Sequence, residues 1–265
     1  MTALLAIVLL GFFLGMRHAT DPDHVVAVTT IVSRERTMLH AVWIGALWGV
    51  GHTLTILAVG SALILFKLTI PPRLGLGMEL SVGVMLIFLG VLNLTGVLRR
   101  IMEWIAIRRL GPGAHSHFRF GRWMVHTHDE DGEPVPAESF PILEWAPQGG
   151  KRLGLFHVLR PLVVGTVHGL AGSAAVALLV LATISRASWA IGYLLIFGLG
   201  TVAGMMLITA AIAVPFAYSI QKFVRLNRGL VLASGFASVA FGLFLCYRIG
   251  FVDGLFTGHL TWIPR

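Results

Sequence analysis

The chain has 265 residues, of which 56% are hydrophobic and only 12% are charged. A water-soluble domain carries about twice that share of charged residues, so the composition excludes an ordinary soluble protein and favours a membrane protein. The net charge of +8 would fit nucleic-acid binding, but basic residues in membrane proteins usually report topology, so no nucleic-acid partner is expected.

Six apolar stretches are long enough to cross a bilayer, which needs about 20 residues per helix. They cover residues 3–32, 39–66, 76–98, 161–183, 189–218 and 229–247. The apolar start lacks the basic region and cleavage site of a signal peptide, so we interpret it as a retained helix. We therefore expect an all-α polytopic membrane protein with six transmembrane helices, embedded in membrane lipid.

The basic residues predict the orientation of these helices. Most of the 20 lysines and arginines lie in the connections after the first, third and fifth expected helices. Because such residues collect on the cytoplasmic side, we expect a multi-pass inner-membrane protein with both termini outside. The long central connection would face the cytoplasm.

The two apolar halves resemble each other. Gly15 and His18 recur 150 positions later as Gly165 and His168, and Gly49 recurs 149 positions later as Gly198. The pattern favours two three-helix repeats, residues 1–98 and 161–265, although chance similarity between glycine-rich helices is the alternative. An odd number of helices inverts the second copy, as in many secondary transporters.

Residues 99–160 form a polar region between the halves. Residues 99–110 alternate arginines with apolar side chains and predict a short helix on the inner membrane surface. The remainder reads as a loop with little order. It contains two His-x-His pairs before an acidic run, which either capture a divalent cation or are incidental; the histidines are His115, His117, His126 and His128.

Residues 15–24 place six polar groups inside the first expected helix. Ionisable groups in a membrane are costly unless they are paired or face a hydrated cavity, so they indicate a functional site. Two carboxylates and two imidazoles could share one cation: His18, Asp21, Asp23 and His24. Pro22 predicts a helix break, with Asp21 as the N-cap of the second part.

Helical spacing does not bring all four side chains together. His18 and Asp21 share a face, whereas Asp23 points about 140° from His18 at 100° per residue. Asp23 can instead orient an imidazole and fix its tautomer. Arg17 is expected to pair with Asp21 or Asp23 when no metal is bound.

Further ligands should come from other helices. His52 lies in a small-residue neighbourhood of the second helix, and His168 occupies the place of His18 in the second half. Either imidazole could simply be a packed hydrogen-bonding residue, but a nearby His and Asp cluster favours a ligand. The hydroxyls of Ser173 and Thr201 are weaker candidates, since such groups commonly pack within membrane helices.

Residues 17–24 resemble the signature R-H-A-x-D-A-D-H of the nickel/cobalt transporter family, with Pro22 in place of an alanine. The family's second motif is similar to Gly51, His52 and Thr53. The resemblance implies metal roles for the histidines and aspartates of these two motifs. It is strong over residues 14–60, looser over 161–210, and similar to the six-helix branch of urease-accessory nickel permeases.

The sequence thus predicts a non-enzymatic secondary permease that carries Ni²⁺ or Co²⁺ through a metal site at the interface of the two repeats. Six residues are the predicted ligands: His18, Asp21, Asp23, His24, His52 and His168. The ion is cargo, so no resident cofactor is expected, and a cytoplasmic metallochaperone is a candidate partner. Uptake is the preferred direction. The alternatives are metal efflux, an intramembrane metal-dependent hydrolase, or an accessory membrane subunit.

Overall fold

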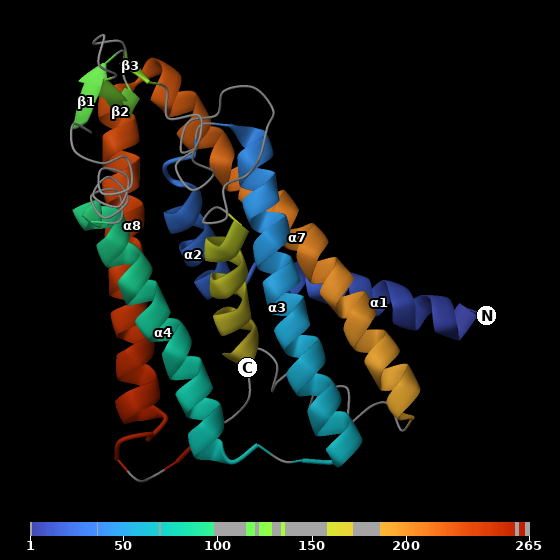
Figure 1. The fold of residues 1–265 in the computed structure, drawn as a ribbon. Helices are drawn as coiled ribbons and strands as arrows, with labels where there is room; N and C mark the ends of the chain where they lie inside the picture. Colours follow the sequence, from blue (N-terminus) through green and yellow to red (C-terminus); the bar gives the residue numbers. More distant parts are fainter. Residues whose placement is uncertain are drawn as a thin grey trace. The chain divides into compact units, whose positions relative to one another are not determined.

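The computed structural model describes residues 2–35, 37–68, 70–97, 115–119, 122–128, 134–135, 158–171, 186–257 and 260–262. The chain divides into two compact units, one made of Met1–Leu94 with Arg160–Arg265 and one made of Thr95–Leu159. Each unit is considered by itself. The helices described below belong to the first unit (Figure 1).

The helices of the first unit broadly match the predicted apolar stretches. They are α1 (Thr2–His18), α2 (Pro22–Val32), α3 (Met38–Phe66), α4 (Pro72–Thr95), α7 (Ala187–Lys222) and α8 (Val224–Tyr247), followed by the short π-helix η2 (Arg248–Val252). A further apolar helix covers Val158–Ala171. Among the described residues, four helices are long and apolar enough to cross a membrane. The predicted continuation over residues 172–183 lies outside the described residues.

The break in the first predicted helix is confirmed. α1 ends at His18, Asp21 is the N-cap residue of α2 with an extended ψ of 143°, and Pro22 begins α2. Proline fits there because the first helical residue needs no N–H partner within the helix. The two helices are not collinear (Figure 1). The chain therefore turns at the point where its polar residues gather.

Glycines let α1 and α7 cross at backbone contact. A Cβ atom on Gly15 would overlap the carbonyl oxygen of Phe197, and one on Gly200 would overlap that of Phe12. Small residues at such crossings allow the close approach that stabilises helix pairs in lipid. The crossing holds the end of α1, and with it His18, against α7.

A second crossing joins α3 to the helix over Val158–Ala171. A Cβ atom on Gly51 would overlap the carbonyl oxygen of Leu162, and one on Gly165 would overlap that of Trp48. His52 follows Gly51 directly, and His168 lies one turn after Gly165. This crossing therefore brings the two histidines close together.

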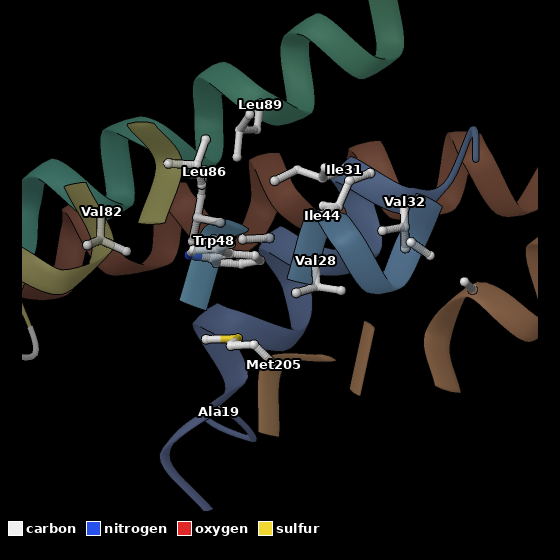
Figure 2. Packing of buried hydrophobic residues seen from close by; sticks show 14 residues of the cluster. Ala19, Val28, Ile31, Val32, Ile44, Trp48, Val82, Leu86, Leu89 and Met205 are labelled. Carbon is white, nitrogen blue, oxygen red and sulfur yellow. The ribbon is translucent and has the colours of Figure 1, made fainter. Parts of the chain in front are cut away.

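The main apolar cluster of the first unit combines residues of α2, α3, α4 and α7 (Figure 2). The Trp48 indole and the Leu86 side chain both belong to this cluster (Figure 2). α4 also binds α8, since the Ser238 hydroxyl donates a 2.8 Å hydrogen bond to the carbonyl oxygen of Leu86. Met205 of α7 also belongs to this cluster.

The second unit has strands within the segment that was predicted to be a loop. It contains three antiparallel strands in the order β1-β2-β3, namely β1 (His115–Arg119), β2 (Arg122–His128) and β3 (Pro134–Val135). The strands are short and contain many polar and charged residues, whereas a buried strand is recognised by its apolar residues. The sequence pattern therefore did not predict them. The predicted surface helix over residues 99–110 lies outside the described residues.

Candidate metal centre

Four histidines from four helices meet in the first unit. His18 ends α1, His24 lies in the first turn of α2, His52 lies in α3, and His168 lies in the helix over Val158–Ala171. His24, His52 and His168 are at most 2% exposed. Buried imidazoles so close to one another need partners or a ligand, because burying an unsatisfied polar group is costly.

The first ligand set consists of His18, His24 and His52, which each offer one donor atom within 4.8 Å of the others. Nε2 of His18 lies 3.0 Å from Nε2 of His52. Nδ1 of His18 lies 2.8 Å from a carboxylate oxygen of Asp21. Asp21 therefore orients His18 so that its Nε2 faces the other imidazoles.

The second ligand set consists of Asp23, His24 and His168, again with one donor atom each within 4.8 Å of the others. Oδ1 of Asp23 lies 3.0 Å from Nδ1 of His24, and Oδ2 lies 2.9 Å from Nε2 of His168. Oδ1 also accepts a hydrogen bond from the backbone N–H of His24. One carboxylate thus fixes two imidazoles from different helices, and His24 belongs to both sets.

Three ring nitrogens in the cluster are buried without a hydrogen-bond partner in the described part of the chain: Nε2 of His24, Nδ1 of His52 and Nδ1 of His168. A metal-ligating histidine typically bonds a carboxylate through one ring nitrogen and the ion through the other. His24 fits this pattern, with Nδ1 at Asp23 and Nε2 available. The arrangement can hold a divalent transition-metal ion by imidazole and carboxylate.

All six predicted site residues lie in or beside this cluster. The helix break explains why Asp23 takes part despite its unfavourable helical angle, because α2 does not continue the turn of α1. Asp21 is an N-cap residue, as predicted, but its carboxylate makes no cap hydrogen bond and pairs with His18. In the described part of the chain Arg17 forms no ion pair with either aspartate, so that prediction was wrong: both acids bind imidazoles instead.

The structure accounts for the remaining candidates less completely. The Thr201 hydroxyl donates to the carbonyl oxygen of Phe197 at 3.0 Å, a packing role within α7. Ser173 lies outside the described residues. The backbone register of the second unit pairs His115 with His126 and His117 with Met124. Metal capture by His115, His117, His126 and His128 stays a prediction.

The sequence interpretation missed Trp48. This residue is fully buried on α3, one turn before His52, and its ring lies parallel to that of His24 with an interplanar angle of 11°. The spacing of four residues between Trp48 and His52 was the available signal, because it places both side chains on one helix face.

Comparison with known proteins gives one clear relative. No family model and no solved structure matches the chain. The urease accessory protein UreH of Bacillus sp. (strain TB-90) is 35% identical over 253 residues, which cover 96% of this chain and 96% of that protein. Such identity across nearly the whole length shows common family membership. The chain belongs to the nickel/cobalt transporter family, in the branch of the urease accessory protein UreH.

Proposed function

We propose that this protein is a secondary permease that carries Ni²⁺ or Co²⁺ into the cell through the buried histidine cluster. The observation that carries the proposal is the convergence of four imidazoles and Asp23, with three buried ring nitrogens left unpartnered among the described residues. A core built for stability alone would satisfy these nitrogens or replace them with apolar groups.

The chemistry of the ligands fits these ions. Imidazole suits nickel, cobalt and zinc, and the affinity of a given site follows the Irving–Williams order, so the ligands define a class of late transition metals. The family membership narrows that class to nickel and cobalt. Asp21 and Asp23 offset the charge of a dication within the apolar surroundings.

An inverted repeat is supported by matching contacts. Gly15 contacts Phe197, and Gly165 contacts Trp48. Gly165 lies 150 positions after Gly15, and Phe197 lies 149 positions after Trp48, so the two contacts are equivalent with the halves exchanged. The His18 ring lies 5.6 Å from that of Phe197, and the His168 ring, 150 positions after His18, lies 5.6 Å from that of Trp48. The contact that the first half makes with the second is therefore repeated, at equivalent positions, by the second half with the first.

The second pair of crossing glycines behaves in the same way. Gly51 contacts Leu162, and Gly200 contacts Phe12. Gly200 lies 149 positions after Gly51, and Leu162 lies 150 positions after Phe12. The cluster lies where these crossings meet, as expected for a transporter whose repeats exchange conformations around a central site. This supports two three-helix repeats over residues 1–98 and 161–265.

The shared imidazole of His24 offers a path through the site. An ion bound by His18, His24 and His52 can pass to Asp23, His24 and His168 while it keeps one ligand. A membrane potential of about 100 mV, negative inside, favours entry of a dication by ~4.6 kcal/mol. We propose that residues 99–160 face the cytoplasm, both termini face outward, and released metal passes to a cytoplasmic metallochaperone.

Accumulation of labelled nickel in cells tests this function. We expect lower accumulation with His18→Ala or His24→Ala than with the wild type, and no change with His40→Ala, which removes a histidine of α3 outside the cluster. Higher accumulation in the cluster variants would show export. Unchanged accumulation in both cluster variants would refute a transport site. It would favour the alternative that the protein is a structural membrane subunit.

A further inference from the structure

We infer that Trp48 is a positioning residue of the metal cluster, whose indole holds the rings of His24 and His168 and favours their metal-bound state. The inference rests on the proposed metal site and adds a residue outside its ligand sets. Trp48 cannot ligate a metal ion, because its indole nitrogen is only a donor.

One indole contacts two imidazoles from two different helices. The Trp48 ring centroid lies 6.0 Å from that of His24 at an interplanar angle of 11°, and 5.6 Å from that of His168 at 57°. The centroids of the two imidazoles are 4.1 Å apart. Asp23 binds the same two rings through its two oxygens. The indole and the carboxylate therefore fix the same pair, one through a ring face and the other through hydrogen bonds.

The surroundings leave the indole little room to move. Trp48 is fully buried, and so is Val28, one turn after His24 in the same apolar cluster. A Cβ atom on Gly165 would lie 2.6 Å from Cδ1 of Trp48. Gly165, one turn before His168, thus provides the space that the indole occupies. Leu86 of α4 belongs to the same buried cluster as Trp48 (Figure 2).

Packing alone does not account for a tryptophan here. Its Nε1 is buried without a hydrogen-bond partner among the described residues, whereas a buried indole N–H usually finds one. Phenylalanine or leucine would fill an apolar core without that cost. The retained indole points to a role for its electron-rich face.

The metal-bound state supplies such a role. An imidazole that donates its lone pair to a dication gains partial positive charge, and a positive group over the face of an aromatic ring is attracted to it, most strongly by tryptophan. The stacked indole therefore favours His24 with a metal over His24 without one. Metal affinity should be highest with the native Trp48, lower in Trp48→Phe and lowest in Trp48→Leu.

Titration of the purified full-length protein with Co²⁺ and with Ni²⁺ tests the inference. We expect Trp48→Phe to weaken binding about 2- to 5-fold and Trp48→Leu about 10-fold or more, the range expected for a cation near a desolvated aromatic face. The visible absorption of bound Co²⁺ should also change in Trp48→Leu, because the imidazoles lose their alignment. Trp43→Leu is the matched control, since Trp43 lies on the same helix and is 49% exposed.

The outcomes separate this inference from the proposed function. If the wild type binds no metal, or binds it as well with His24→Ala, both are overturned. If His24→Ala abolishes binding while Trp48→Leu keeps the affinity and Co²⁺ spectrum of the wild type and loses only thermal stability, Trp48 is a packing residue and this inference alone fails. Where Trp48→Leu does not fold, wild-type affinity and spectrum in Trp48→Phe overturn the inference.

Discussion

Oδ2 of Asp23 lies 2.9 Å from Nε2 of His168, although 145 positions separate the two residues in the chain. This contact joins the first apolar half of the protein to the second. The same carboxylate also binds Nδ1 of His24 at 3.0 Å through its other oxygen. The strength of both contacts depends on the negative charge that the two oxygens share. Asp23 is therefore the polar link on which both the position of His168 and the orientation of His24 depend.

Asp23→Asn should lower nickel accumulation about 10- to 100-fold, the usual cost of removing a carboxylate that orients metal ligands. The amide keeps the size of the side chain but loses its charge and one acceptor oxygen. Asp21→Asn serves as the comparison, because Asp21 is 48% exposed and, among the described residues, its carboxylate pairs with His18 alone. Equal effects of the two substitutions would contradict the special place of Asp23.

His24 should matter more for metal binding than His52 or His168, because it alone belongs to both ligand sets. We expect His24→Ala to abolish binding, whereas His52→Ala and His168→Ala each leave one set and retain weakened binding. Metal at 100 times its Kd should stabilise the wild type by about 2.7 kcal/mol, and a chelator should remove that gain. Thermal unfolding with and without Ni²⁺ measures both effects, and a stabilisation kept in His24→Ala would refute the shared ligand.

Much of this architecture could be predicted from the sequence. The apolar stretches and Pro22 determine the helices and the break, because lipid leaves the backbone few alternatives to helix. The cluster itself was predicted only as a list of residues. Its pairings depend on the angle between α1 and α2, which periodicity cannot supply, and this is why Arg17 was wrongly paired with the aspartates. The strands β1 to β3 are too short and too polar for apolar alternation to reveal them.

The crossing glycines give a test of the fold that can be measured without metal. Gly165→Ala should destabilise the protein by about 1–3 kcal/mol or prevent its accumulation in the membrane, because the new Cβ atom would overlap the backbone of Trp48. Gly192→Ala is the control, since a Cβ atom there meets nothing within 4 Å. Amounts of folded protein by size-exclusion chromatography compare the two, and equal yields would contradict the close crossing.

Asn93 ties α4 to the end of α2 and to α8. Its Oδ1 accepts a 2.9 Å hydrogen bond from Nε of Arg34, its carbonyl oxygen accepts one of 2.6 Å from Nη2 of Arg34, and its Nδ2 donates to the carbonyl oxygen of Val231 and to Oγ of Ser234, each at 3.2 Å. Asn93 is only 7% exposed. Asn93 therefore joins α4 to α8 and to the turn that follows α2.

Asn93→Leu should lower the free energy of unfolding by about 1–3 kcal/mol, because the buried groups that it bonds lose a partner and leucine offers none in return. Ser81→Ala provides the control, since the Ser81 hydroxyl donates to the carbonyl oxygen of Met78 in its own helix and to no other helix in the part of the chain that the structure describes. Thermal unfolding in detergent, followed without metal, measures the difference. Metal affinity should remain near that of the wild type in both variants, because Asn93 contacts none of the cluster histidines in the described structure. A large loss of affinity in Asn93→Leu at unchanged stability would instead show that this network acts on the metal site itself.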